Sequence, residues 1–531
     1  MSAGVTSLPE VPEVRAAGVP RLTAGFDLAE RLDLAGHLVV HGPLPPLSGE
    51  RLAALAEGIA LRGRGGAGFP FARKLRAVAD AAVRRGVRPV VVVNGSEDEP
   101  ACRKDTVLLN RAPHLVLDGA LLAAEALGAR TLVVGVTRDS TRRSTERALD
   151  ERGLADRRGA GLRARVQRNP HRMVTGESSA LIRSIDGGPA KPPGRKVRAA
   201  ETGVGGAPTL LSNAETFAQL AVAARTGVDR YRSTGVPDEP GTVLLTLSGA
   251  VARPLVLEAP SGVPLRYALQ LAGAPADPQG VLTGGYHGRW LDPAAAHGAV
   301  VSRAALERVG GRLGAGAVLP LARDTCPLGE ALPVARWLAG ESAGQCGPCH
   351  RGLPAAARGL EEVLTGGGPP ALEALRQITD AVRGRGACRH PDGSADFVES
   401  ALVAFADDLA AHVLGGGCGR PVRAVLPLGT GGTGAVDGDA GEASGRVLTV
   451  DWTLCEGHRL CADIVPELLP IGPDGYPSVA EVPVPHRSLA DAERAVRRCP
   501  ALALRLEADP RHAAGPEAPG RGRRALRRGR G

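Results

Sequence analysis

Three cysteines near the C-terminus have the spacing of iron–sulfur ligands. Cys455 and Cys461 flank His458, and Cys499 follows with a proline directly after it. Adjacent turns of backbone can present thiolates to neighbouring irons of a cluster, while a distant cysteine closes the cage. His458 stands where a further cysteine is expected. It can ligate through a ring nitrogen, or leave the three thiolates to hold a three-iron cluster, so both 3Fe-4S and 4Fe-4S remain open.

A second group of cysteines lies in the middle of the chain. Cys346 and Cys349 are separated by two residues, and Cys388 follows about forty residues later. This spacing also predicts an iron–sulfur cluster, 4Fe-4S or 3Fe-4S. Ala343 stands where a third closely spaced cysteine is expected, and alanine cannot ligate iron. The residues that could supply the missing ligand are His350, Cys326 and Cys418.

Competing explanations of these cysteines fit the sequence less well. A zinc ribbon needs two pairs of cysteines, each pair separated by two residues, and the chain has one such pair. The 9 cysteines are odd in number and few for 531 residues, and Met1 to Pro20 lacks the apolar core of a signal peptide. Disulfides are therefore not expected, and we expect a cytoplasmic protein.

The composition also argues against membrane spans and nucleic acid. No stretch approaches the ~18 uninterrupted apolar residues of a membrane helix. The formal charge of +9 comes largely from arginines of the Gly- and Pro-rich tail 509–531, which predicts a solvated, disordered tail. Aromatic residues make up only 2% of the chain, which argues against a base-stacking surface.

A glycine-rich loop in the first half predicts an anion site. Gly63-Arg-Gly-Gly-Ala-Gly-Phe-Pro70 lies between two helical patterns, Leu52–Leu61 and Phe71–Arg85. Such a loop lets backbone N–H groups approach an anion at the N-terminus of the following helix. The loop matches the dinucleotide fingerprint literally, but that fingerprint must follow a strand, and here a helix is expected before it.

The segment after this loop alternates between strands and helices. Arg88–Asn94 is a continuous β-branched run, typical of a parallel strand covered on both faces, and it ends in an acidic turn that contains Glu97 and Glu99. In open α/β sheets, ligands bind beyond such carboxyl ends. A doubly wound α/β sheet is therefore predicted. The remaining elements expected here are helices 113–127 and 141–152 and strands 130–136 and 162–166.

Several motifs in order resemble one known family. They are Gly63-Arg-Gly-Gly-Ala-Gly-Phe-Pro70, Asn94 with the Glu97-x-Glu99-Pro turn, Gly176-Glu177-Ser-Ser-Ala-Leu181, Pro208-Thr-Leu-Leu-Ser-Asn213-Ala-Glu215-Thr, and Glu341-Ser with Cys346-x-Pro-Cys349. Together they resemble the NADH- and FMN-binding flavoprotein subunit of respiratory complex I and its relatives in NAD-linked hydrogenases and formate dehydrogenases. Residues 450–506 resemble a single-cluster bacterial ferredoxin.

The resemblance implies an FMN site. Its phosphate and ribityl chain would lie near Gly63, Arg64, Gly65 and Lys74, with Gly66 also letting the backbone approach. The flavin would be surrounded by Asn94, Glu97, Gly176, Glu177 and Asn213. Phe69 would help to hold the nicotinamide dinucleotide, with Glu99 near the same pocket.

The resemblance also implies a domain order. It comprises an N-terminal extension (1–48), a doubly wound FMN/NADH-binding α/β domain (49–236), a ubiquitin-like β-grasp domain (237–318), a helical iron–sulfur domain (319–420) and an α+β ferredoxin-like domain (447–508). The small sheet of the β-grasp domain would use residues 242–251, 255–258 and 280–291. The Gly/Thr-rich composition of residues 421–446 predicts a flexible linker.

The sequence departs from the family where the dinucleotide should bind. Ser96, Met173 and Ser178 replace an aspartate, a tyrosine and a glutamate that the family usually carries, and an aromatic expected just after Lys74 is missing. Each change removes a hydrogen bond or a stacking contact worth roughly 1 kcal/mol.

Two functions are therefore considered. The first is an oxidoreductase in which FMN accepts hydride from NADH and single electrons pass through the clusters to a protein acceptor. The alternative is an electron-transfer relay with a degenerate NADH site, fed or drained through its ferredoxin domain. A structural scaffold without flavin requires the glycine-rich loop to be mere packing. No nucleic acid or membrane span is expected, although peripheral association with a membrane redox complex is compatible with the sequence.

Overall fold

A computed structural model describes residues 7–154, 161–194, 198–428, 443–472 and 475–509. The chain divides into two compact units, Met1–Ala435 and Val436–Gly531. The basic tail beyond residue 509 and the Gly/Thr-rich stretch 429–442 lie outside the described residues.

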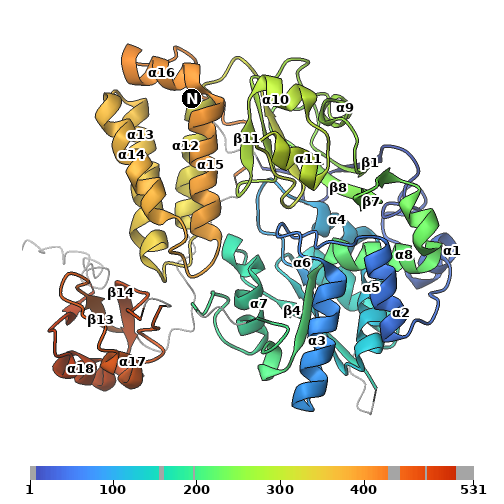
Figure 1. Cartoon of the computed structure of the whole chain (residues 1–531), viewed down its shortest axis with the longest axis horizontal. Coiled ribbons are helices and arrows are strands. Elements are labelled where there is room, and N and C mark those ends of the chain that lie inside the picture. Colours follow the sequence, from blue (N-terminus) through green and yellow to red (C-terminus); the bar gives the residue numbers. More distant parts are fainter. Residues whose placement is uncertain (1–6, 155–160, 195–197, 429–442, 473–474, 510–531) are drawn as a thin grey trace, which may run out of the picture. The chain divides into compact units, whose positions relative to one another are not determined.

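A four-stranded parallel sheet forms the centre of the first half, with strand order β4-β3-β2-β5 (Figure 1). The valines of β2 alternate between two cores: Val91 and Val93 face one layer of helices, whereas Val92 packs with Leu181 of α7 on the other face. The predicted doubly wound fold is therefore confirmed. The strands are β2 (Val90–Gly95), β3 (Thr131–Val136), β4 (Arg163–Arg168) and β5 (Thr209–Asn213), and the helices are α2 (Gly49–Gly58), α3 (Phe71–Arg85), α4 (Lys104–Arg111), α5 (Pro113–Leu127), α6 (Asp139–Glu151), α7 (Ser178–Ile185) and α8 (Ala214–Arg232).

The chain order of these strands reverses beside β2. The chain runs from β2 to β3 to β4 and then crosses back to place β5 on the other side of β2. The carboxyl ends of β2 and β5 therefore border a topological switch point, where open α/β sheets bind ligands.

A second, six-stranded sheet follows, with order β1-β9-β8-β12-β10-β11. Its last five strands have the arrangement expected of a β-grasp sheet, and the segment predicted at 280–291 is a hairpin of two strands. The sheet continues to Leu321, past the predicted boundary at residue 318. Its strands are β8 (Thr242–Leu247), β9 (Leu255–Pro260), β10 (Gly280–Thr283), β11 (Arg289–Leu291) and β12 (Ala317–Leu321), accompanied by the β6–β7 hairpin (Gly235–Val236, Glu239–Pro240) and by α9 (Leu265–Leu271), α10 (Pro293–Gly298) and α11 (Arg303–Arg308).

The N-terminal extension is part of this body. Its strand β1 (Glu13–Ala16) pairs in parallel with β9 and widens the grasp sheet. The buried Glu258 carboxylate accepts hydrogen bonds from the backbone N–H groups of Leu22 and Thr23, each at 2.9 Å. Helix α1 (Leu34–His41) follows.

A bundle of helices closes the first unit, with α12 to α15 side by side in Figure 1. It contains α12 (Pro327–Gly340), a π-helical turn (Pro348–Gly352), α13 (Leu353–Leu364), α14 (Gly368–Val382), α15 (His390–Ala404) and α16 (Ala406–Gly415). π-Helical turns often occur at functional sites, and this one carries Cys349.

The predicted linker 421–446 is wrong at both ends. The Glu330 carboxylate accepts hydrogen bonds from the backbone N–H groups of Ala424 and Val425, at 2.9 and 3.0 Å, and Leu426 is buried. Four residues at the other end, 443–446, already belong to strand β13. Backbone groups satisfied by a buried carboxylate hold residues 421–428 on the bundle, which composition could not reveal.

The second unit has its own core. An antiparallel sheet of order β14-β13-β15 packs against two helices and a hydrophobic cluster that includes Leu448, Val465 and Ala492. The predicted small α+β domain is confirmed. Its elements are β13 (Ala443–Val450), α17 (Leu460–Ile464), β14 (Glu481–Pro485), α18 (Leu489–Arg498) and β15 (Leu504–Ala508). Among the described residues of the whole chain, no single helix is long and apolar enough to cross a membrane, although the bent pair Lys104–Arg111 and Pro113–Leu127 passes that test jointly.

Candidate electron-transfer sites

The predicted flavin residues from four separate segments meet at the switch point. Asn94, at the end of β2, donates through Nδ2 to the Gly176 carbonyl at 2.8 Å. Asn213, at the end of β5, donates to the Asn94 carbonyl at 3.4 Å. A Cβ placed on Gly65 would lie 3.3 Å from the Asn213 Cβ, so glycine allows the loop to approach closely. Asn94, Gly176, Asn213 and Gly65 thus surround one point at the carboxyl edge of the sheet.

The glycine-rich loop is closed at its base and open at its tip. A bridge joins Arg62 to Pro70, and Gly63 N–H donates to the Phe69 carbonyl at 2.9 Å. Gly66 has a φ of +103°, and a Cβ there would meet no atom within 4 Å. Positive φ favours glycine, and the open space above Gly66 leaves room for an anion against the backbone.

Phe69 is exposed at the tip of this loop. Its side chain is 46% exposed, and the Arg73 guanidinium lies 5.7 Å from the ring centroid. An exposed aromatic ring beside a cation is suited to stacking against a ring of a ligand.

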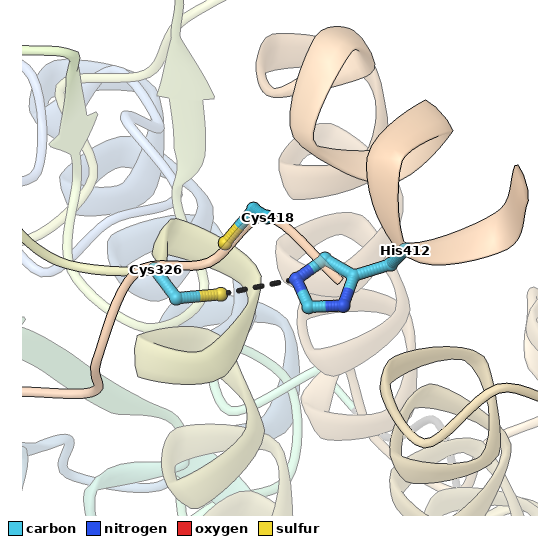
Figure 2. A group of neighbouring side chains, drawn as sticks. All are labelled: Cys326, His412 and Cys418. Carbon is cyan, nitrogen blue, oxygen red and sulfur yellow. Dashed lines mark hydrogen bonds between the residues drawn. The ribbon is translucent and has the colours of Figure 1, made fainter. Parts of the chain in front are cut away.

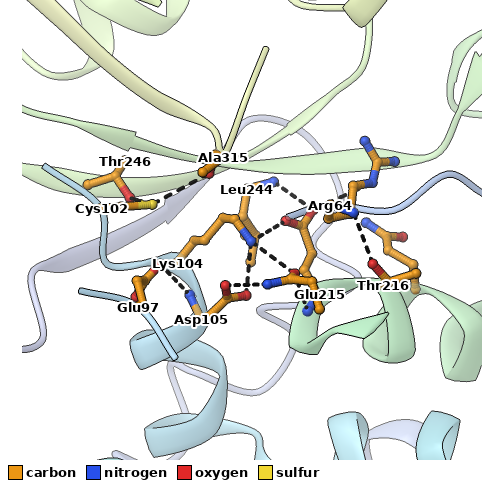
Figure 3. Close-up of polar contacts among 12 residues, drawn as sticks. Arg64, Glu97, Cys102, Lys104, Asp105, Glu215, Thr216, Leu244, Thr246 and Ala315 are labelled. Atoms are coloured by element: carbon orange, nitrogen blue, oxygen red, sulfur yellow. Dashed lines mark hydrogen bonds and ion pairs between the residues drawn. The ribbon is translucent and has the colours of Figure 1, made fainter. Parts of the chain in front are cut away.

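Beneath the loop lies a buried polar network that the sequence did not predict (Figure 3). The Lys104 ammonium contacts Asp105 at 2.9 Å and Glu215 at 3.2 Å, and donates to Asn213 Oδ1 at 3.1 Å. The Arg64 backbone N–H donates to Thr216 Oγ1 at 3.0 Å. The network joins the loop to the starts of α4 and α8. Two features of the sequence could have pointed to this network. Lys104 is one of only four lysines in an arginine-rich chain, and Glu215 lies in the same motif as Asn213.

The acidic turn after β2 is buried, and its carboxylates have different environments. Glu97 accepts from the backbone N–H groups of Asp105 and Thr106, at 3.0 and 2.9 Å, and so caps α4. Burial opposes its ionisation, but the attraction of Lys104 and these N–H groups lower the pKa of Glu97 overall. Glu99 accepts from Tyr286 N–H at 2.7 Å, and burial raises the pKa of Glu99 to about 7.

Two further predicted residues are engaged by protein backbone. The Lys74 ammonium donates to the Leu211 carbonyl of β5 at 2.8 Å, and burial lowers the pKa of Lys74. The Glu177 carboxylate caps α7 by accepting from the N–H groups of Ser179 and Ala180, at 2.8 and 3.0 Å. Glu97, Glu99, Lys74 and Glu177 therefore shape the edge of the site, and each has a structural partner.

The three cysteines of the middle group come together in the helical bundle. Cys346 and Cys349 are buried in one apolar cluster with Leu353, Val382 and Ala395. The pKa of the Cys388 thiol is raised to about 12, chiefly by burial and to a smaller extent by the nearby charges of Glu177 and Cys346. A hydrogen bond with Cys349 lowers the pKa of Cys346 to about 6. Adjacent thiols within an apolar cluster fit an iron–sulfur site, whose irons would hold them as thiolates.

Two of the three residues considered for the missing ligand are excluded. Cys326 caps the N-terminus of α12, whereas Cys346 follows the C-terminus of that helix. A helix of 14 residues is about 21 Å long, so Cys326 cannot reach the cluster. Cys418 lies beside Cys326 and is excluded with it. His350, adjacent to Cys349 and exposed, stays a prediction.

The segment just before Cys346 contacts the candidate flavin site directly. Arg172 donates to the Gly340 carbonyl at 2.7 Å, and the Met173 N–H donates to Glu341 Oε2 at 2.8 Å. These residues begin the turn that leads to Gly176, which holds Asn94. The end of α12 and the edge of the parallel sheet are thus joined by one short segment, residues 172–177.

The C-terminal group also converges as predicted. Cys455, His458, Cys461 and Cys499 line one pocket of the second unit. Burial raises the pKa of the Cys461 thiol, and the charges of Cys455 and Cys499 raise it further. The three cysteines are each half-buried, and the His458 side chain is 46% exposed, with Nε2 3.7 Å from Glu456. Three thiols around an otherwise open pocket fit a cluster close to the surface.

Comparisons with known proteins assign these regions to described families. Residues 57–222 match the Nuo51 FMN-binding domain, residues 330–412 the NADH-ubiquinone oxidoreductase-F iron-sulfur binding region, and residues 448–506 a 4Fe-4S single cluster domain. A flavoprotein with two iron–sulfur domains is therefore the class of protein that the fold and the site define.

The relatives make the assignment more specific. The F subunit of NADH-quinone oxidoreductase in Mycobacterium tuberculosis strain H37Rv is 30% identical over 395 residues, covering 71% of this chain and 86% of the relative. The F subunit in Streptomyces coelicolor is 30% identical, covering 69% and 84%. A crystal structure of an NAD+-reducing [NiFe]-hydrogenase in the H2-reduced state superposes with a TM-score of 0.66 and 26% identity, covering 76% of this chain and 68% of that one. The chain belongs to the family of NADH-quinone oxidoreductase F subunits.

Proposed function

We propose that this chain is an NADH-oxidising flavin and iron–sulfur oxidoreductase, which passes electrons from its FMN site to the middle cluster, then to the ferredoxin unit and on to a protein acceptor. Nicotinamide moves two electrons and clusters move one, and FMN supplies the conversion between them when it is bound.

The observation that carries this proposal is the contact between the flavin edge and the cluster loop. Segment 172–177 bonds at one end to Gly340 and Glu341, just before the cluster cysteines, and at the other to Asn94. An electron that leaves a flavin at Asn94 would have to cross only this segment. The fixed backbone keeps both redox sites at a constant separation.

The residues proposed to hold FMN are those at the switch point. The open backbone of Gly66 would face the phosphate, and Asn94 and Asn213 would bind along the cofactor. The buried Lys104 is neutralised by Asp105 and Glu215, so its proposed role is to hold Asn213 in place, while the backbone N–H groups of the loop would face the anionic phosphate. Phe69, exposed at the tip of the loop, is proposed to stack on the nicotinamide dinucleotide.

The relay without NADH oxidation is the second candidate. It is favoured by the engagement of Glu97 and Glu177, whose carboxylates both cap helices and so bind backbone N–H groups in place of a ligand. In addition, Ser96 and Ser178 replace acidic residues expected there.

Stopped-flow mixing of the full chain with NADH separates the two candidates. Rapid loss of the flavin absorption is expected, and Phe69→Ala should slow it about two- to tenfold, since an aromatic stacking contact is worth about 0.5–1.5 kcal/mol. Tyr267→Ala is the matched control, because Tyr267 is equally exposed, at 44%, but lies on α9. A flavin that dithionite bleaches but neither NADH nor NADPH reduces would establish the relay instead.

The partner and the location complete the proposal. The half-exposed cysteines of the second unit suit exchange with a protein that docks there, and peripheral association with a membrane redox complex is compatible with this arrangement. Clusters held by free thiolates need a reducing compartment, which supports a cytoplasmic location.

A further inference from the structure

Cys326, His412 and Cys418 form a third cluster of metal-ligating side chains, separate from both iron–sulfur groups (Figure 2). One ligand atom from each lies within 4.8 Å of the other two. Cys326 and His412 are buried, and Cys418 is half-buried. The three residues come from distant parts of the chain: the start of α12, the last turn of α16 and the segment that follows α16.

The geometry of this cluster fits one ion. The Cys326 Sγ lies 3.3 Å from His412 Nε2. A tetrahedral zinc ion, with Zn–S of about 2.3 Å and Zn–N of about 2.0–2.1 Å, separates such ligand atoms by about 3.6 Å. The ring nitrogen Nδ1 of His412 has no hydrogen-bond partner among the described residues, so the tautomer that leaves Nε2 free is available. An iron–sulfur cube, by contrast, needs its thiolates on separate irons.

We propose that Cys326, His412 and Cys418 bind one Zn2+ ion, with the fourth position held by water. Two thiolates and one imidazole are soft and borderline ligands that suit zinc. Their two negative charges neutralise the ion, which lowers the cost of placing it in a largely buried site.

A zinc ion at this position would act as a structural clamp. It would join the start of α12 to the end of α16, immediately before residues 421–428, which the Glu330 carboxylate holds on the bundle. Cys326 already receives a hydrogen bond from Gly329 N–H at 3.2 Å, so its sulfur is fixed in place. The ion would determine where the chain leaves the first unit toward the ferredoxin.

The test uses the full chain, purified anaerobically with its clusters, and measures zinc and iron separately. About one zinc per chain is expected, and absorption at the zinc edge should show two sulfur ligands and lighter ligands at the distances typical of zinc. Cys418→Ser and His412→Gln should each lower the affinity for added zinc more than about 10- to 100-fold, the loss typical of changes to residues that only support the ligands. Iron and flavin should be retained, which verifies folding.

Cys102→Ser is the matched control, because Cys102 is a buried free thiol that is not a member of this cluster and donates to the Ala315 carbonyl at 3.4 Å. The zinc content of this variant should stay at one per chain. Proteolysis between residues 416 and 428 should become faster when zinc is removed from the unmodified protein. The proposal would be overturned if zinc persists in both ligand variants, or if the unmodified protein fails to bind added zinc. It would also be overturned by iron at this site, or by a Cys326–Cys418 disulfide in the anaerobic protein.

Discussion

The two groups of cluster cysteines differ in their surroundings. Cys346 and Cys349 lie in an apolar cluster of the helical bundle, at 6% and 2% exposure, and follow Glu341, which bonds to the segment that borders the proposed flavin site. Cys455, Cys461 and Cys499 are half-buried and line a pocket in a unit with its own core.

This difference indicates two kinds of electron transfer. A cluster sealed in the core exchanges electrons only with neighbours fixed by the fold, whereas a cluster near the surface can meet a separate protein. Burial, local charge and solvent exposure also set the reduction potential of a cluster. The middle cluster is therefore suited to receive electrons from flavin, and the C-terminal one to deliver them.

Loss of one buried cysteine should have the largest effect. Cys349→Ser should leave NADH reduction of the flavin intact but slow reduction of the ferredoxin cluster more than about 100-fold, since removal of a ligand exceeds the roughly 10- to 100-fold cost of changing a residue that only supports the ligands. Rapid-freeze paramagnetic resonance would follow each cluster separately.

The corresponding change in the other unit sharpens this result. Cys461→Ser should abolish the C-terminal signal while the middle cluster is still reduced by NADH at the normal rate. If instead the C-terminal cluster is reduced normally in Cys349→Ser, the electrons bypass the middle cluster and the proposed order is wrong.

A change in the glycine-rich loop should affect only the first unit. Gly66→Val should weaken FMN binding about tenfold or more, because a hydrogen bond to a charged group is worth about 1.5–3 kcal/mol and the side chain would enter the space above the loop. The cluster of the second unit should be unchanged. Flavin content after purification gives the measurement.

The backbone strain of this substitution needs its own control. Gly86 also has positive φ, +60°, with open space for a Cβ, but caps the far end of α3. Gly86→Val should therefore retain FMN. Equal loss of flavin in both variants would assign the effect to instability, and stoichiometric FMN in Gly66→Val would remove the loop from the site.

His458 should have an effect confined to one cluster. The fragment 443–509, which contains the core of the second unit, is suitable for paramagnetic resonance. A three-iron cluster on Cys455, Cys461 and Cys499 gives a signal when oxidised, and a four-iron cluster gives one when reduced. If the unmodified fragment gives a signal only when reduced, and His458→Ala gives one only when oxidised, the histidine is a ligand. A signal from the unmodified fragment when oxidised would establish the three-iron form.

The smallest effect is expected at the contact between flavin edge and cluster loop. Arg172→Ala removes hydrogen bonds to Gly340 and Ser342 and should slow flavin-to-cluster transfer about two- to tenfold, since each bond is worth about 0.5–1.5 kcal/mol. Arg168→Ala is the control, because Arg168 makes an exposed ion pair with Asp139. If flavin-to-cluster transfer is equally fast in Arg172→Ala and in the unmodified chain, this contact does not set the distance between flavin and cluster.

Much of the first sheet could be predicted because its signals are local. The β-branched run at residues 88–94 became β2, and helices 71–85 and 113–127 were predicted with the bounds that the structure gives. Runs of one periodicity determine one element. Strand β1 lacks such a signal: it has four residues, two of them charged, and exists because the open edge of β9 pairs with it.

The grouping of the cysteines was predictable for the same reason, and the polar network was not. Cys346 and Cys349 are near neighbours in sequence, so their spacing alone indicates a cluster. Lys104 and Glu215 are more than a hundred residues apart and meet only because β2 and β5 are adjacent in the sheet.

The sequence by itself determined the chemistry of this protein, since cysteine spacing and ordered motifs specified flavin, clusters and family. Only the tertiary structure decided which distant groups share a site. It separated Cys326 and Cys418 from the middle cluster by the length of α12 and placed them beside His412. It also fixed residues 421–428 on Glu330. The physical reason is that ligand spacing is a property of a few residues, whereas distances between remote segments depend on helix length and on how the elements pack.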